Sequence, residues 1–323
     1  MNFNEIIGHR RPIRLLQKAI LNDHLPQAYL FHGPEGIGKR LTAVTLAKAV
    51  NCKEGKEDCC DECLSCRKIE DSNHPDVMVI RPDGQFIRID SIRQLRRALS
   101  YRVYEGKRRV CILDGADQMK AEGANALLKT LEEPPPDTLL ILVARERESL
   151  LPTIVSRCQQ VRFTSLPIDE MIEELTRRLS MEKGEAKILA ELSQGSLGRA
   201  AEMFEHEVWE KRPEIIRDLM DLSSQGVKQA FAMAESLAGL GESLPLLFPV
   251  MMSWYRDLIV WNEQQNVDRL VNQDFCEEVK EKAVLMSPRS LVRRVEAINQ
   301  MSKALRLNAN PRLAMESLML QLR

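Results

Sequence analysis

The chain has 323 residues, of which 44% are hydrophobic and 29% are charged, and its net charge is −1. This length allows two or three domains, and this composition is that of a folded globular protein and excludes a disordered chain. The sequence also lacks a secretory signal and any run of roughly 18 apolar residues, which predicts a cytoplasmic protein without a membrane partner.

The first half of the chain alternates short β-like runs with helical stretches. The predicted strands are 28–34, 76–82, 108–117 and 138–146. The predicted helices are 39–50 and 121–135, the second of which is terminated by Pro134. Strands that alternate with helices in this way predict a parallel sheet covered on both faces.

From residue 168 onward the β-alternation disappears, and apolar residues recur at helical spacing. The sequence GSLG interrupts this pattern at 195–198. A later stripe, which we expect to face a core, consists of Met251, Trp254, Leu258 and Trp261. The sequence thus predicts three parts, which are an α/β domain at 1–165, a small helical domain at 166–206 and an all-α domain at 207–323.

The segment GPEGIGKR, residues 33–40, joins the first predicted strand to the helix after it. Gly33, Gly36 and Gly38 allow successive backbone N–H groups to surround phosphate oxygens, and the following helix adds the positive end of its dipole. Lys39 supplies a point charge for terminal phosphates. The pattern predicts a nucleotide-binding P-loop, and the plain alternative is a glycine-rich turn that binds nothing.

Two groups that hydrolysis needs are missing from this loop region. In P-loop NTPases, magnesium is held by a Ser or Thr after the lysine and by an acidic residue at the end of a neighbouring strand. Here the hydroxyl position is Arg40, and Asp114 is followed by Gly115 where many such ATPases carry a glutamate. We therefore expect no hydrolysis, whereas binding of ATP stays open.

Five of the eight cysteines lie between residues 52 and 66. Cys52, Cys60, Cys63 and Cys66 include two consecutive CxxC steps, a spacing typical of a structural zinc site with four thiolates. Cys59 could replace Cys60 in this set. An iron–sulfur cluster is the chemical alternative, and free thiols are the plain one. The many acidic neighbours argue against a third possibility, a nucleic-acid-binding knuckle.

A basic segment lies between residues 88 and 109, where eight basic residues outnumber two acidic ones. Such a segment can face phosphates, and Arg93, Arg96 and Arg97 are then the candidates for contact with DNA. A solvated helix face next to a basic turn explains the same residues equally well.

Arg157 lies in a Ser-Arg-Cys triplet ahead of a predicted short strand. An arginine at the edge of a domain can reach into a neighbour's nucleotide site and stabilise charge on the transferring phosphoryl group. A single surface arginine is usually only solvated, so the context of the triplet has to support this interpretation.

With these residues assembled, the chain resembles the delta-prime subunits of the bacterial DNA polymerase III clamp loader, within the AAA+ superfamily. The segments that carry the resemblance are IIGH at 6–9, AYLFHGPEGIGK at 28–39, the cysteine knuckle at 52–66, HPDV at 74–77, IRIDSIRQL at 87–95, NALLKTLEEPP at 125–135, LLPTIVSRC at 150–158, GSLGRA at 195–200 and NANPRLAMESL at 308–318. They span nearly the whole chain, and NALLKTLEEPP followed by Ser-Arg-Cys is highly specific for clamp-loader subunits.

The resemblance implies a fold and an assembly. The fold is an AAA+ α/β P-loop domain that carries a zinc module, followed by a helical lid domain and an all-α collar domain. In this family the collar joins five subunits into a ring with a gap. The ring opens a sliding clamp and places it on primed DNA.

The resemblance also implies roles for single residues. Arg157 would act as an arginine finger in trans at the ATP site of an adjacent motor subunit. The four cysteines of the knuckle would bind a structural Zn²⁺. The motor subunits carry the loop hydroxyl and the glutamate, so Arg40 and Gly115 place this sequence with the delta-prime subunits.

Two functions therefore stay open. The first is an interaction protein, a non-hydrolysing clamp-loader subunit whose partners are the other subunits of a hetero-pentameric ring, the clamp and, through the complex, primed DNA. The second is an enzyme, an active AAA+ ATPase with an unusual loop. The sequence shows no polymerase carboxylate pair, so we expect polymerase chemistry to belong to other subunits of the holoenzyme.

Overall fold

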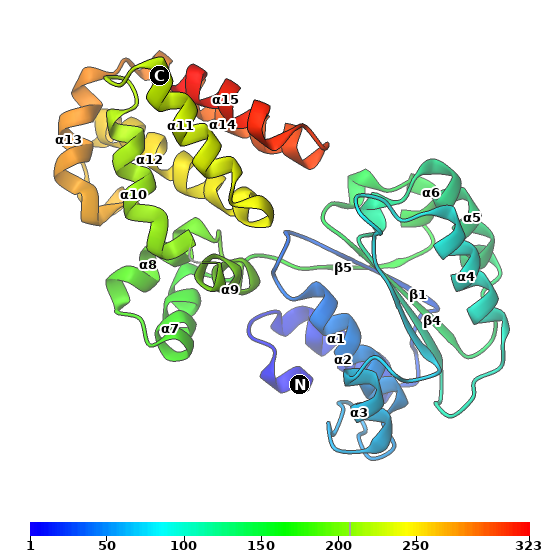
Figure 1. Ribbon diagram of the computed structural model, residues 1–323. Coiled ribbons are helices and arrows are strands. Elements are labelled where there is room, and N and C mark those ends of the chain that lie inside the picture. The colour runs from blue at the N-terminus through cyan, green and yellow to red at the C-terminus, as the bar shows by residue number, and fades with distance from the viewer. Residues whose placement is uncertain (207) are drawn as a thin grey trace. The chain divides into compact units, whose positions relative to one another are not determined.

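The structure is a computed structural model that describes residues 1–206 and 208–323 of the chain. It divides into two compact units, residues 1–166 and residues 167–323, which Figure 1 shows as an α/β part and a helical part. The fold class expected from the sequence is confirmed at this level, because a parallel sheet with flanking helices precedes an all-helical region.

Five strands form one parallel sheet in the first unit, in the order β2-β3-β4-β1-β5. The strands are β1 (Ala28–His32), β2 (Val77–Ile80), β3 (Arg109–Asp114), β4 (Thr138–Ala144) and β5 (Gln159–Arg162). Each lies within or beside a predicted strand. The central position of β4 and β1 explains why their sequences are continuous apolar runs, since both faces of a parallel sheet are covered.

Helices cover both faces of this sheet, as Figure 1 shows. They are α1 (Arg10–Leu21), α2 (Lys39–Asn51), α3 (Leu64–Glu70), α4 (Ile89–Ser100), α5 (Ala121–Glu132) and α6 (Pro152–Val155), with short 3-10 turns at Phe3–Glu5, Ala116–Gln118 and Arg147–Ser149. Alternate residues of β4 serve the two faces, since Leu139 and Ile141 pack with α1 and α2, whereas Leu140 and Leu142 pack with α4, α5 and α6.

Helix α5 ends earlier than predicted. Its last residue is Glu132, and Glu133 has left the helical region with φ −128° and ψ 67°. The ring of Pro134 restricts the residue before it to extended conformations, so the helix stops ahead of the proline instead of reaching residue 135.

The second unit consists of helices. They are α7 (Ile168–Leu179), α8 (Lys183–Leu192), α9 (Leu197–Glu205), α10 (Val208–Asp221), α11 (Val227–Ala238), α12 (Leu244–Gln264), α13 (Cys276–Leu285), α14 (Pro288–Arg306) and α15 (Pro311–Leu322), with 3-10 turns at Gly241–Ser243, Val267–Arg269 and Gln273–Phe275. Met251, Trp254 and Leu258 of the predicted stripe are buried, whereas Trp261 is partly exposed. Among the described residues, no single helix is both long and apolar enough to cross a membrane.

The break predicted at GSLG separates α8 from α9. Gln194 and Gly195 have positive φ angles of 55° and 75°, and the Ser196 side chain accepts a hydrogen bond from the N–H of Arg199 to begin α9. The boundary between lid and collar stays a prediction, because the structure places both parts in one compact unit. Glu207, the first residue of the predicted collar, lies outside the described residues.

Candidate functional site

The P-loop sequence forms the turn between β1 and α2. Gly33, Gly36 and Gly38 all have positive φ angles, of 146°, 72° and 97°. A Cβ at Gly33 would lie 2.2 Å from the backbone oxygen of Phe163, so close approach as well as conformation requires glycine there. The chain thus has the strand–loop–helix arrangement of a phosphate-binding loop, and the binding of a nucleotide in it stays a prediction.

Lys39 is turned back onto the loop that precedes it. Its Nζ donates hydrogen bonds to the backbone oxygens of Gly33 at 2.7 Å and Pro34 at 2.5 Å, and the residue is only 7% exposed. Burial lowers the pKa of Lys39 to about 8, although Glu35 and Asp117 act in the opposite direction. A bound phosphate would have to draw this ammonium away from the two loop oxygens.

Arg40 and Asp114 meet where a P-loop NTPase holds magnesium. The Nε of Arg40 lies 3.6 Å from Oδ2 of Asp114, which ends β3. Burial raises the pKa of the Asp114 carboxyl, and the nearby charges of Arg81 and Lys39 oppose this shift. The ion pair places a guanidinium beside the carboxylate that would ligate magnesium, and this positive charge disfavours a divalent cation there.

Gly115 holds a backbone conformation that a glutamate would adopt only with strain. Its φ angle is +84°, and a Cβ would lie 3.1 Å from Cγ of Pro82. Its N–H donates to the backbone oxygen of Val143 at 3.0 Å, which fixes the end of β3 against β4. The backbone at position 115 therefore disfavours the glutamate that many ATPases carry there.

Arg157 lies at the other edge of the sheet. It follows α6 and precedes β5, whose first residue, Gln159, pairs with Tyr29 of β1, so Arg157 is at the amino ends of these strands. Gly33 follows the carboxyl end of β1. The four residue steps from Tyr29 to Gly33 alone separate the two places by roughly 13 Å at the rise of a parallel strand. The chain does not bring its candidate finger to its own P-loop.

The Arg157 side chain is 36% exposed, and it has two hydrogen-bond partners among the residues that the structure describes. Nη2 donates to Oε1 of Glu132 at 2.7 Å, and Nη1 donates to the backbone oxygen of Thr153 at 2.9 Å. Arg157 also lines a pocket of about 310 Å³, which Thr130, Leu131 and other residues of the amino edge complete. Sequence reasoning missed Glu132, because no local pattern connects residues that are 25 positions apart.

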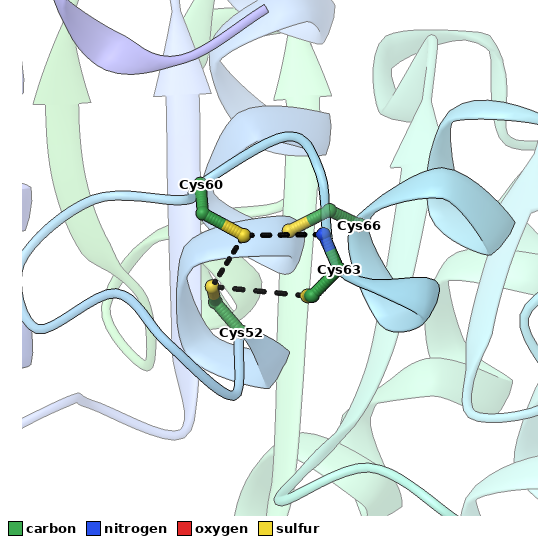
Figure 2. Close-up of side chains that lie close together, drawn as sticks. All are labelled: Cys52, Cys60, Cys63 and Cys66. Atoms are coloured by element: carbon green, nitrogen blue, oxygen red, sulfur yellow. Dashed lines mark hydrogen bonds between the residues drawn. The ribbon is translucent and has the colours of Figure 1, made fainter.

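The four cysteine sulfurs of the predicted metal site lie together, as Figure 2 shows. All four lie within 4.8 Å of one another, and Cys52 Sγ is 3.6 Å from Cys60 Sγ and 4.0 Å from Cys63 Sγ. Thiolates at the Zn–S distance of ~2.3 Å in a tetrahedron are about 3.8 Å apart, so the sulfurs fit this metal. Cys66 completes the set from α3.

Backbone N–H groups favour the thiolate form at this cluster, whereas burial raises the pKa of Cys66. The N–H of Gly55 donates to Cys52 Sγ at 3.1 Å, and the N–H of Cys63 donates to Cys60 Sγ at 3.3 Å. Burial opposes ionisation of Cys63, yet hydrogen bonds from Lys53 and Cys66 lower its pKa to about 6. Metal binding requires thiolates, and these contacts supply part of that preference.

Cys59 is not part of the cluster. Its Sγ lies 3.7 Å from the backbone oxygen of Met1 and 3.6 Å from Oδ1 of Asp61, and burial raises the pKa of its thiol to about 12. Of the two assignments that the sequence left open, the structure therefore favours Cys60.

The basic segment separates into two kinds of residue. Arg93, Arg96 and Arg97 are exposed on α4, whereas Arg109 is buried and its Nη2 donates to Oδ1 of Asp76 at 2.8 Å. Asp76, from the HPDV stretch, also accepts the backbone N–H groups of the turn at 104–106. That motif is explained by structure, and contact between the α4 arginines and DNA stays a prediction.

Comparison with known proteins adds two family models and several relatives. One model, described as "DNA polymerase III, delta subunit", matches residues 8–167, and another, "DNA polymerase III, delta subunit, C terminal", matches residues 206–323. DNA polymerase III subunit delta' of Bacillus subtilis is 32% identical over 97% of this chain and 95% of its own length. Its counterpart in Pseudomonas aeruginosa is 36% identical over 71% of this chain and 69% of its own length. Among solved structures, a gamma subunit-related protein of Thermotoga maritima superposes with a TM-score of 0.45 at 17% identity, over 97% of this chain and 98% of that one.

Proposed function

Because this chain belongs to the delta-prime subunits of bacterial DNA polymerase III, we propose that it acts in a clamp-loader ring as an arginine donor that does not hydrolyse ATP. Arg157 enters the ATP site of an adjacent motor subunit and stabilises charge on the transferring phosphoryl group. The partners are the other subunits of a hetero-pentameric ring, the sliding clamp and, through the assembled ring, primed DNA. The place of action is the bacterial cytoplasm.

The position of Arg157 is the observation that carries this proposal. It lies at the amino edge of the sheet, whereas the loop that resembles a nucleotide site lies at the carboxyl edge. An arginine side chain reaches only about 7 Å from its Cα, which is less than the length of the strands between the two places. A nucleotide that Arg157 serves has to belong to another chain.

Absence of hydrolysis is supported by the two departures at the carboxyl edge. Arg40 supplies a guanidinium that is paired with Asp114 in place of a magnesium-binding hydroxyl. Gly115 supplies no carboxylate to orient water, and its left-handed backbone explains why the position holds glycine. The loop then serves to shape the domain, or holds a phosphate or nucleotide without turning it over.

The cysteine cluster has the role of a structural zinc site in this proposal. Cys52, Cys60, Cys63 and Cys66 would hold the ion, and four protein ligands leave no open position for catalysis. The bound ion would connect the end of α2 to α3 and hold the knuckle between them. An acidic, four-thiolate knuckle of this kind supports folding more than contact with nucleic acid.

ATP turnover by the reconstituted clamp loader, with clamp and primed DNA present, tests the proposal. We expect Arg157→Ala to lower the turnover of the adjacent motor site by about 10³- to 10⁵-fold, the range for an arginine finger. The isolated chain should show no turnover. Arg178→Ala is the matched control, because Arg178 is 46% exposed and forms a surface ion pair with Glu174 at 3.0 Å.

The rival function, an active AAA+ ATPase, predicts the opposite pattern. Turnover by the isolated chain, abolished by Lys39→Ala, would establish that rival and overturn the assignment of Arg40 and Gly115. Equal turnover of assemblies with Arg157→Ala and with the unchanged chain would overturn the arginine-donor role.

A further inference from the structure

An ion pair joins the two sequence stretches that are most specific to this family. Glu132 is the last residue of α5, in NALLKTLEEPP, and Arg157 is the arginine of the Ser-Arg-Cys triplet. The carboxylate oxygen Oε1 of Glu132 accepts a hydrogen bond from Nη2 of Arg157 at 2.7 Å. The backbone oxygen of Thr153 accepts one from Nη1 at 2.9 Å. Both terminal nitrogens of the guanidinium are therefore held by the chain itself.

Both ends of this pair are anchored in the core. Leu131, which precedes Glu132, and Cys158, which follows Arg157, are each 8% exposed and belong to the same apolar cluster beneath α5 and α6. The backbone positions of the two charged residues are thus fixed relative to each other. What stays variable is the long side chain of Arg157, and the two hydrogen bonds restrict it.

The guanidinium keeps donors for a partner. An arginine has five N–H donors, and the contacts with Glu132 and Thr153 use one on Nη2 and one on Nη1. Within the described part of the chain, three N–H groups have no further acceptor, one on each terminal nitrogen and one on Nε. A phosphoryl group can accept from these while the two contacts with the chain stay in place.

We propose that Glu132 is the positioning residue of Arg157, which orients the guanidinium toward the phosphoryl group of the adjacent subunit. This inference rests on the proposed role of Arg157 as a finger in trans. It explains why the two stretches occur together in one domain, since one supplies the finger and the other supplies its support. Catalytic groups act best when a neighbouring side chain has already selected their orientation.

The expected size of the effect follows from the exposure of the pair. Glu132 is 49% exposed and Arg157 is 36% exposed, so water competes with the contact and only part of the orientation depends on it. Loss of a contact of this kind corresponds to a decrease in kcat of about 2- to 5-fold, far smaller than the decrease expected when the arginine itself is removed.

The test compares kcat and KM for ATP in the reconstituted loader, with clamp and primed DNA present. Glu132→Ala should lower kcat about 2- to 5-fold and leave KM unchanged, because the residue does not bind the nucleotide. Glu132→Gln keeps the shape and a neutral acceptor, so its kcat should lie between that of Glu132→Ala and that of the unchanged chain. Glu133→Ala is the matched control, being an exposed glutamate at the next position, and should leave kcat unchanged.

A double variant separates positioning from a structural effect on the ring. Arg157→Ala with Glu132→Ala should be no slower than Arg157→Ala alone, because a positioning residue without its arginine has nothing to orient. Thermal melting of each isolated variant checks that the fold is kept.

Three results would overturn the inference while leaving the arginine-donor role intact. The first is a kcat of Glu132→Ala equal to that of the unchanged chain. The second is a higher kcat, which would mean that Glu132 holds the arginine back. The third is a further loss in the double variant. If Arg157→Ala itself is without effect, the proposed function fails, and this inference fails with it.

Discussion

The two edges of the same parallel sheet carry similar charged residues and use them differently. At the carboxyl edge, the ammonium of Lys39 is bonded to loop oxygens, and Arg40 is paired with Asp114. At the amino edge, Arg157 is more than a third exposed beside a pocket and keeps unused donors after its contacts with Glu132 and Thr153.

Under the proposed function, this difference is how a nucleotide-binding fold would change its task and keep its sequence pattern. The P-loop glycines and Lys39 are present, yet the Lys39 ammonium is hydrogen-bonded to backbone oxygens of the loop and the Arg40 guanidinium is paired with Asp114. Arg157 lies at the opposite edge, away from the P-loop of its own chain. The motif by itself therefore indicates the fold, and the proposal about function depends on the partners of the charged atoms at each edge.

The four-cysteine cluster lies toward the amino edge, because α2 begins at the P-loop and runs back to Asn51, whose Oδ1 accepts a hydrogen bond from the N–H of Arg108 just ahead of β3. We expect Cys60→Ala to lose bound zinc and to lower the free energy of unfolding by at least about 3 kcal/mol, since the ion connects α2 to α3. Zinc content by atomic absorption and urea unfolding of the purified chain measure the two effects. Treatment with a strong chelator should shift the unfolding midpoint of the unchanged chain in the same direction.

Cys59→Ala is the control for this prediction. Cys59 is adjacent to Cys60 and is buried, but its sulfur lies near Met1 and Asp61 instead of the cluster. This variant should retain full zinc content. Equal zinc loss in both variants, or full zinc content in Cys60→Ala, would contradict the assignment of the four ligands.

Much of this arrangement could be predicted from local patterns in the sequence. Apolar runs gave the strands, glycine spacing gave the loop, and the spacing of Cys60, Cys63 and Cys66 gave the cluster, because each depends on residues near one another in the chain. The partners of Arg157 and Arg109 could not be predicted in this way. Each meets a carboxylate 25 or more positions away, and only the folded sheet brings them together.

Titration of Lys39 tests whether its ammonium is buried at the carboxyl edge, because burial lowers its pKa from 10.5 to about 8 in the folded chain. Between these two values the unfolded chain binds more protons than the folded chain, so the free energy of unfolding rises with pH in this window. Relative to Lys39→Met, the unchanged chain should gain about 2–3 kcal/mol between pH 8 and pH 10.5. Urea unfolding of both proteins at several pH values measures this difference.

Lys18→Met provides the control, since Lys18 is exposed on α1 and this variant retains Lys39, so its free energy of unfolding should rise with pH as that of the unchanged chain does. A difference between the unchanged chain and Lys39→Met that stays constant with pH would mean that Lys39 is solvated. The P-loop would then be open to a phosphate, and the contrast between the two edges would be smaller than the hydrogen bonds of Lys39 indicate.

Restoring the missing hydroxyl and carboxylate at the carboxyl edge tests whether these two groups alone prevent hydrolysis. Gly115→Glu should lower the free energy of unfolding by about 1–2 kcal/mol, because a side chain at φ +84° is strained and its Cβ lies close to Pro82. Arg40→Thr alone removes an exposed ion pair and should change it by less than about 1 kcal/mol. The isolated double variant should still not hydrolyse ATP, and an assay of phosphate release measures this.

We expect no turnover because hydrolysis needs the carboxylate of residue 115 to point toward the attacking water. The left-handed backbone at this residue directs a side chain elsewhere. Turnover by the double variant would show that Arg40 and Gly115 were the whole difference from a motor subunit. Turnover without loss of stability would show in addition that the left-handed backbone relaxes easily. Continued inactivity, with the expected loss of stability, would place the difference in the fold of the β3 end as well as in its two side chains.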